Sequence, residues 1–247
     1  LTEGADVDED AEIDPTQRAA RSEGRSPAAI LVSTFSDELR SSNNGQSKVI
    51  GLSVKDRGAI SMAGHTGTAY WFSKASGEFV TSTYYLDRYP DWVQAFNATA
   101  PAAQFANTSW TLLHDQATYL FGDSDDRAWE TDVAGFGRTF PHAFGDGSSP
   151  YFTTWLTLSP AGDRMVLDFA KQALVGEQLG KDDVTDYLSV SFSSTDYVGH
   201  VFGASSLESE DNLARLDRTL AELFAYIDDK IGLENTLIVL SADHGQP

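Results

Sequence analysis

Residues 187–200 read YLSVSFSSTDYVGH, and this stretch decides the predicted fold. It runs from a short apolar, β-forming segment into small residues and then places Asp196 and His200 four residues apart. Residues 236–245, TLIVLSADHG, repeat that order and end in the adjacent pair Asp243 and His244. One such stretch is compatible with an ordinary strand and a polar turn, but two of them ask for a common explanation.

The segment between the two stretches is a predicted helix. Residues 209–231 carry leucine, phenylalanine and isoleucine at intervals of three and four, and Gly232 follows as a stop. Strands are predicted at 187–192 and 236–241, so the order is strand, helix, strand. That order predicts two parallel strands that are neighbours or near neighbours in one sheet.

The remainder of the chain extends this pattern. A third buried strand is predicted at 48–54 (KVIGLSV), after a helix over about 27–41 that Ser26 caps and Asn-Asn-Gly ends. Two aromatic segments between Ala69 and Tyr85 predict a hairpin outside the main alternation. The other expected regions are an acidic surface loop or linker at 1–26, a partial domain at 27–247, an irregular inserted segment at about 69–160 that is least regular over 97–153, and a helix from Met165 toward Gly180. The fold class is therefore α/β, with a mostly parallel sheet between helices and an irregular α+β insertion.

Composition limits the classes of function. The 247 residues include 37 Asp plus Glu and 17 Lys plus Arg, for a net charge of −20. Such a surface repels nucleic acid and anionic lipid, so neither is an expected partner. Cysteine is absent, which leaves oxygen and imidazole as the metal ligands. The sequence has no run of about 20 apolar residues, and because it begins at Leu1 and ends at Pro247, we expect it to be part of a longer polypeptide.

Three predicted strands deliver charged side chains to one edge of the sheet. Lys55 and Arg57 follow the 48–54 strand, and the two Asp/His pairs follow the other two strands. Ligands of open parallel sheets collect at the carboxyl ends of the strands. Carboxylate plus imidazole is a common zinc shell, and two metal ions about 4 Å apart suit phosphoryl transfer. Lys55 and Arg57 then offer positive charge to the phosphoryl oxygens.

Each motif alone has an ordinary structural explanation. A single Asp-x-x-x-His pair is common, an Asp-His-Gly sequence is usually a turn at a strand end, and Lys-Asp-Arg is usually a solvated loop. His65, in AGHTG, is expected to lie in a glycine-rich turn rather than to bind metal. His114 and His142 lie in the irregular segment and receive no role. The metal hypothesis therefore depends on the convergence of the motifs and not on any one of them.

Together these residues resemble the alkaline phosphatase superfamily. SFSSTDYVGH, the leucine-rich helix and LIVLSADHG are similar to the second half of its metal core. SVKDRGAI, AGHTG, AYWF and LDFAKQALVGEQLG narrow the resemblance to the large phosphate-irrepressible bacterial alkaline phosphatases, over roughly residues 27–245. The resemblance implies an alkaline phosphatase-like core with two zinc ions, Asp196 and His200 binding one and Asp243 and His244 the other. It also implies that Lys55 and Arg57 contact the phosphoryl group of a small-molecule phosphate ester.

The same resemblance implies parts that these 247 residues lack. A threonine nucleophile, which forms a covalent phospho-enzyme, and a first metal-binding aspartate belong upstream, and a further zinc-binding histidine belongs downstream. We therefore expect phosphomonoesterase activity in the intact protein, no activity in these residues alone, and a periplasmic or secreted location. Two alternatives stay open: a phosphodiesterase or nucleotide pyrophosphatase of the same superfamily, and a non-catalytic relative that binds metal or phosphate. A sulfatase is a more distant fit.

Overall fold

The computed structural model describes residues 25–245, so most of the predicted acidic segment at 1–26 lies outside the described residues. Two compact units make up the chain. Unit 1 comprises residues up to Gln104 together with Met165–Phe192, and unit 2 comprises Phe105–Arg164 together with residues from Ser193 onward. Among the described residues, no helix combines the length and the hydrophobicity that crossing a bilayer requires.

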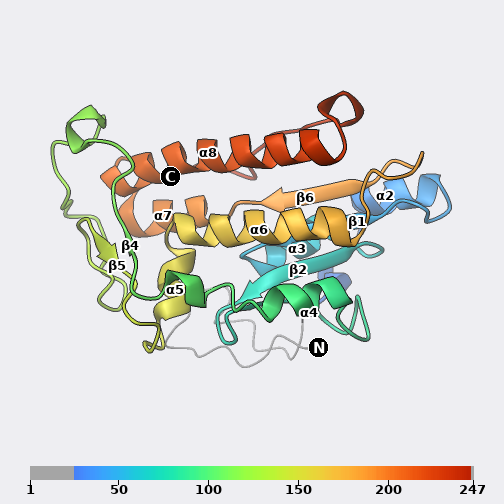
Figure 1. The fold of residues 1–247 in the computed structure, drawn as a ribbon, viewed down its shortest axis with the longest axis horizontal. Coiled ribbons are helices and arrows are strands. Elements are labelled where there is room, and N and C mark those ends of the chain that lie inside the picture. The colour runs from blue at the N-terminus through green and yellow to red at the C-terminus, as the bar shows by residue number, and fades with distance from the viewer. Residues whose placement is uncertain (1–24, 246–247) are drawn as a thin grey trace. The chain divides into compact units, whose positions relative to one another are not determined.

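Unit 1 is built on a sheet of four strands in the order β3-β2-β1-β6 (Figure 1). β1 pairs in parallel with both β2 and β6, and β2 pairs antiparallel with β3. The strands are β1 (Val49–Ser53), β2 (Thr68–Ser73), β3 (Glu78–Val80) and β6 (Tyr187–Ser191). The predicted α/β class with a mostly parallel sheet is confirmed, as are the strands predicted at 48–54 and 187–192.

The two faces of β2 are covered by different side chains. Ala69 and Trp71 pack with Ala59, Ile60 and Ala63 of α3 (Asp56–Ala63). Gly51 of β1 permits this packing, because a Cβ there would collide with the carbonyl oxygen of Ala59. A small residue is therefore needed where α3 approaches the strand.

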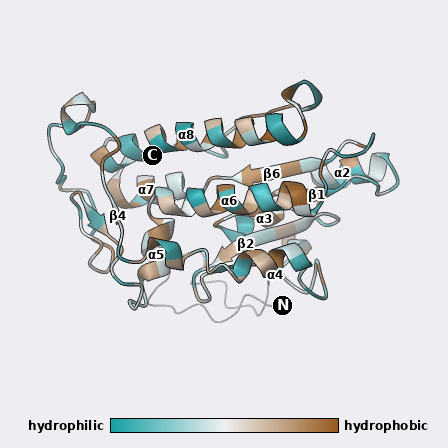
Figure 2. Cartoon of the chain, in the orientation of Figure 1, coloured by the Kyte–Doolittle hydropathy of each residue, from teal (hydrophilic) through white to brown (hydrophobic). Residues whose placement is uncertain are grey.

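The alternate residues of β2 enter an aromatic cluster. Phe79 stacks on Phe169 of α6 (Pro160–Gly176) with ring centroids 4.2 Å apart, and Tyr70 meets Phe169 edge-on at 5.5 Å. Trp92 and Phe96 of α4 (Asp91–Asn97) complete the cluster around Phe169. Full burial of each phenylalanine contributes about 1.5–3 kcal/mol to folding. Figure 2 shows the hydrophobic colouring on β6 and the mixed colouring of α8 (Leu207–Lys230), the helix predicted at 209–231.

Three expectations are corrected by the structure. The helix predicted at 27–41 is a short 3₁₀ turn, η1 (Pro27–Ala29), and a separate helix, α2 (Phe35–Ser42). Thr34 and Asp37 form a capping box that starts α2 afresh, so the chain is extended at Thr34 rather than helical. The aromatic hairpin exists, but β2 lies within the main sheet and not outside it.

The third correction concerns the strand predicted at 236–241. The segment follows η4 (Leu233–Asn235) without pairing with any strand in the described part of the chain. Leu237 is 90 % exposed and Val239 78 % exposed. A strand is stabilised by its partner, so β-forming composition predicts the run but cannot supply the neighbour. Hence β6 lies at an edge of the described sheet and its residues are only half-buried.

Unit 2 contains residues 105–153 of the irregular region predicted at 97–153, and the helices that follow β6. A buried carboxylate ties the two parts together. Asp211, fully buried on α8, accepts hydrogen bonds from Trp110 Nε1 at 2.6 Å, Tyr119 Oη at 2.5 Å and the Leu113 amide at 2.7 Å, and pairs with Arg215 Nε at 2.6 Å. The remaining elements of the chain are η2 (Ala103–Phe105), β4 (Ser109–Trp110), η3 (Gln116–Thr118), β5 (His142–Ala143), α5 (Phe152–Thr157) and α7 (Ser194–Phe202).

We predict that Asp211→Ala lowers the free energy of unfolding by about 3–5 kcal/mol, because it leaves the partly buried guanidinium of Arg215 and three other donors without their acceptor. Urea denaturation followed by circular dichroism measures the loss. Asp217→Ala, an exposed change on the same helix, is the matched control and should stay within about 0.5 kcal/mol of the parent. Equal losses in the two variants would contradict the role given to Asp211.

Candidate metal and phosphate site

α7 presents the first Asp/His pair as the sequence predicts. It begins at Ser194, two residues beyond Phe192, and carries Asp196 in its first turn and His200 in its last. The i, i+4 spacing brings the two side chains to one side of the helix, with His200 Nε2 3.4 Å from Asp196 Oδ1. The other face of α7 is buried, so the helix holds the pair at the surface of unit 2.

The second Asp/His segment meets the first at Asp196. His244 Nε2 lies 3.3 Å from the same Oδ1 atom of Asp196 that His200 approaches. His244 Nδ1 lies 2.8 Å from the carbonyl oxygen of Gly245, which can only accept, so Nδ1 donates there. Nε2 of the neutral ring then carries the lone pair that a metal would need. Asp243 is 3.7 Å from His244 Nε2 and its side chain is 90 % exposed.

The donor atoms suit zinc in type and in spacing. Zinc bonds of about 2.0–2.2 Å in a tetrahedron separate neighbouring ligand atoms by about 3.3–3.5 Å. The 3.4 Å between Asp196 Oδ1 and His200 Nε2, the pair expected to share one ion, falls on that value. It is longer than an ordinary N–H···O hydrogen bond of about 2.9 Å. No group of three or more His, Asp or Glu side chains within residues 25–245 is already arranged around a metal position. The described residues thus fit part of a zinc shell and not a complete one.

Lys55 and Arg57 lie at the start of α3 in unit 1. Lys55 is the N-cap residue, is 7 % exposed, and donates its amide to Ser53 Oγ at 2.9 Å. Arg57 is exposed in the first turn, and Asp56 between them pairs with Arg25 Nε at 2.5 Å. The first turn of a helix presents unpaired amides, which bind anions. Two cationic side chains at this position make the start of α3 a suitable place for phosphate.

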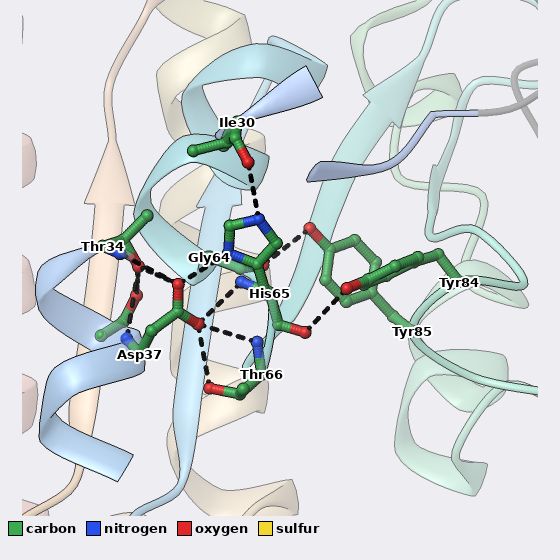
Figure 3. Close-up of polar contacts among 9 residues, drawn as sticks. Ile30, Thr34, Asp37, Gly64, His65, Thr66, Tyr84 and Tyr85 are labelled. Carbon is green, nitrogen blue, oxygen red and sulfur yellow. Dashed lines mark hydrogen bonds and ion pairs between the residues drawn. The ribbon is translucent and has the colours of Figure 1, made fainter. Parts of the chain in front are cut away.

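His65 has a structural environment and lies in the turn between α3 and β2, as expected (Figure 3). Its Nδ1 is 2.8 Å from Asp37 Oδ2, and its Nε2 is 2.9 Å from the carbonyl oxygen of Ile30. Because both ring nitrogens face acceptors, the imidazolium form can donate at both. Gly64 precedes it with φ +67°, and a Cβ there would collide with the Thr34 hydroxyl.

Asp37 collects donors from both sides of this network. Its carboxylate accepts from the Thr34 amide at 3.0 Å, the His65 amide at 2.8 Å and the Thr66 amide and hydroxyl, each at 3.0 Å. Burial raises its pKa, but hydrogen bonds from His65, Thr34 and Thr66 outweigh burial and hold the pKa far below its usual range. The hydrogen bond to Asp37, helped by that to Ile30, raises the pKa of His65.

His142 forms a buried hydrogen-bonded pair with Glu208, which the sequence analysis did not predict. Its ring is fully buried among Trp110, Phe140 and Phe202, and its Nε2 is 3.1 Å from Glu208 Oε1. Glu208 lies in the first turn of α8. Asp37, by contrast, had a readable signal, because Thr34 and Asp37 stand at capping-box spacing.

The profile of the type I phosphodiesterase / nucleotide pyrophosphatase family matches residues 35–247. The chain belongs to this family. It lies within the alkaline phosphatase superfamily, as the resemblance indicated. The geometry described above is therefore that of a family member whose Asp/His pairs converge in one unit.

Individual relatives agree with that assignment. The chain is 42% identical to the alkaline phosphatase PhoV of Synechococcus elongatus, over 89% of this chain and 40% of that protein. It is 42% identical to a calcium-transporting ATPase of Myroides odoratus, over 94% of this chain and 44% of that protein. The solved structure of wild-type alkaline phosphatase PafA is 38% identical, covers 81% of this chain and 39% of that chain, and gives a TM-score of 0.72. The chain thus spans less than half the length of the relatives it matches.

We predict that His65→Gln lowers stability most at mildly acidic pH. A raised histidine pKa contributes stability that is fully present below the ordinary value of 6.5 and is lost as pH rises through the raised pKa. The lowered pKa of Asp37 contributes above its ordinary value of 3.8, so the pair stabilises most between pH 3.8 and 6.5. Urea midpoints measured from pH 5 to 9 should show the gap between parent and variant closing as pH rises. His114→Gln, an exposed change, should show no such trend; a gap that is independent of pH would refute the assignment.

Proposed function

We propose that the intact gene product hydrolyses phosphate monoesters at a site containing two zinc ions. The observation that carries the proposal is the approach of two imidazoles to one oxygen of Asp196, with His200 at the spacing of two ligands of one zinc ion. Hydrolysis of phosphoesters is supported by relatives that are named alkaline phosphatases, one of which is structurally similar over most of this chain.

In this proposal Asp196 and His200 bind one zinc ion, and Asp243 and His244 bind the other. Zinc ions about 4 Å apart have adjoining ligand shells, which is consistent with the 3.3 Å separation of Asp196 and His244. When bound, the two ions supply Lewis acidity at the attacking and leaving oxygens. The chain's own contribution is to hold the ligands, with His244 oriented through its hydrogen bond to Gly245.

Lys55 and Arg57 are proposed to bind the non-bridging oxygens of the phosphoryl group. Lys55 and Arg57 follow the carboxyl end of β1, and β6 runs parallel beside β1, so the two strands end on the same side of the unit 1 sheet, where ligands of parallel sheets collect. We further propose a covalent phospho-enzyme on a nucleophile outside residues 1–247, and export to the periplasm or the medium.

Charge favours a monoester over a diester as the substrate. A monoester presents a dianionic phosphoryl group, which two cationic side chains neutralise better than the single charge of a diester. The matched family takes its name from diester and pyrophosphate hydrolysis, so phosphodiesterase activity is the second candidate. The third, a non-catalytic relative, would bind zinc or phosphate without turnover.

We predict that Asp196→Ala and His200→Ala each lower zinc content and reduce monoester turnover by more than about 100-fold, because each removes a ligand from a shell that must be complete. Metal analysis of the purified full-length protein and steady-state assays measure both effects. His114→Ala, a histidine exposed elsewhere in unit 2, should change neither. Unchanged zinc content in both ligand variants would remove the metal assignment.

We predict that Arg57→Ala keeps the zinc content but lowers kcat/KM for monoesters by about 10–100-fold, the equivalent of a lost charge-assisted hydrogen bond. The loss for a matched diester should be smaller, because that substrate carries less negative charge. Arg88→Ala, another exposed arginine of unit 1, is the control. Equal losses on the two substrates would favour the phosphodiesterase.

A further inference from the structure

The N-terminus of α7 is capped from another helix. Ser193, the residue before the helix, has φ −87° and ψ 0° and gives no side-chain capping hydrogen bond. The amide of Ser194 donates instead to Asp163 Oδ1, at 3.1 Å. Asp163 lies in the first turn of α6, within unit 2, and is 2 % exposed. The helix that carries Asp196 and His200 therefore begins on a carboxylate 31 residues away in the chain.

The first turns of α6 and α7 are in close contact at Gly162 and Ser194. A Cβ added to Gly162 would collide with Ser194 Oγ, and it would also lie 3.2 Å from the carbonyl oxygen of Leu156. Ser194 is fully buried. The first turn of α7 therefore cannot slide toward α6, and it cannot move away without breaking the hydrogen bond to Asp163.

A second buried polar side chain holds the same turn from α8. Asn212, 1 % exposed, donates its Nδ2 to Thr195 Oγ1 at 3.0 Å. Ser194 and Thr195 immediately precede Asp196 in the chain. Two consecutive residues of the turn are thus fixed by side chains from two different helices.

Burial disfavours the ionised form of Asp163. An anion at a helix N-terminus is favourable, but burial raises the pKa of Asp163 to about 7 against the hydrogen bonds from Ser194. Because the pKa of Asp163 is raised by folding, ionising this group destabilises the folded protein. Its contribution to stability is therefore fully present below the ordinary value of 3.8 and is lost as pH rises toward 7. Its Oδ2 has no hydrogen-bond partner within residues 25–245. An apolar residue would avoid this cost, so stability alone does not explain the carboxylate.

We propose that Asp163 is a positioning residue for the metal site: by fixing the start of α7 it holds Asp196 and His200 at zinc-binding spacing. The proposal rests on the proposed function and adds to it a side chain that touches neither metal nor substrate. Its action passes through the Ser194 amide, which any acceptor of the same shape can satisfy. Asparagine keeps such an oxygen and alanine does not.

The experiment compares Asp163→Ala, Asp163→Asn and Ser159→Ala in the intact gene product. Ser159 is the matched control because it is equally buried and its Oγ accepts from the Ala161 amide at the start of α6. Ser159→Ala thus weakens the same end of α6 while leaving the hydrogen bond to α7 in place. Melting temperatures measure the general loss of stability in each variant.

Two readouts separate positioning from stability. Hydrogen–deuterium exchange over residues 194–202 in metal-free protein should quicken in Asp163→Ala but not in Ser159→Ala. Chelator competition should show zinc bound about 10–100-fold more weakly in Asp163→Ala, with kcat reduced and the monoester KM within about two-fold. Asp163→Asn should restore the exchange protection, the zinc affinity and kcat toward the parent values.

Each outcome decides between the two proposals. If Asp163→Ala and Ser159→Ala behave alike in exchange and in zinc affinity, the positioning role is wrong while the zinc phosphatase stands. If Asp163→Asn fails to restore zinc affinity, the Ser194 hydrogen bond is not the means, and the proposal is overturned. If the parent protein binds no zinc and hydrolyses no phosphoester, the proposed function itself fails, and the positioning role fails with it.

Discussion

Asp196 places one carboxylate oxygen against two imidazole nitrogens, and the functional assignment depends on that contact. His244 has committed its Nδ1 proton to the Gly245 carbonyl, so the Nε2 of the neutral ring presents a lone pair to the carboxylate. Two lone pairs at 3.3 Å repel unless a proton or a cation lies between them.

The sequence was most informative where one element could be recognised from its own residues. The periodic leucines of 209–231 describe α8 to within two residues of its start, and the apolar runs at 48–54 and 187–192 became paired strands. The same reasoning failed at 236–241, because a strand also needs a neighbour, and none pairs with it in the described residues. It failed again at 27–41, where the local hydrogen bonds of Thr34 and Asp37 outweigh apolar periodicity.

The candidate site divides in the same way. Asp196 and His200 could be predicted because their spacing is a property of one helix. Asp243 and His244 were predicted from a repeated sequence pattern, although the strand expected before them pairs with no strand in the described residues. The contact between Asp196 and His244 was testable only in three dimensions. Asp163, Asn212 and the buried His142 pair had no such pattern, since each acts on a residue far along the chain. A buried polar side chain needs a hydrogen-bond partner, and the spacing of residues in the sequence does not show which distant residue is that partner.

Asp163 also shows how stability and function can be told apart. A residue kept for stability alone should lower the free energy of the folded state under working conditions, whereas burial disfavours the ionised form of this carboxylate. Asp37 gives the contrast within the same chain: the hydrogen bonds it accepts favour its ionised form and hold its pKa low, as expected of a stabilising carboxylate. Two buried aspartates at helix starts thus have opposite pKa shifts. Asp37 caps its own helix, while Asp163 caps the helix that carries Asp196 and His200, although burial disfavours its ionised form. Packing alone does not explain a buried carboxyl group at this position, whereas its hydrogen bond to the first residue of α7 does, and that contact favours a positioning role.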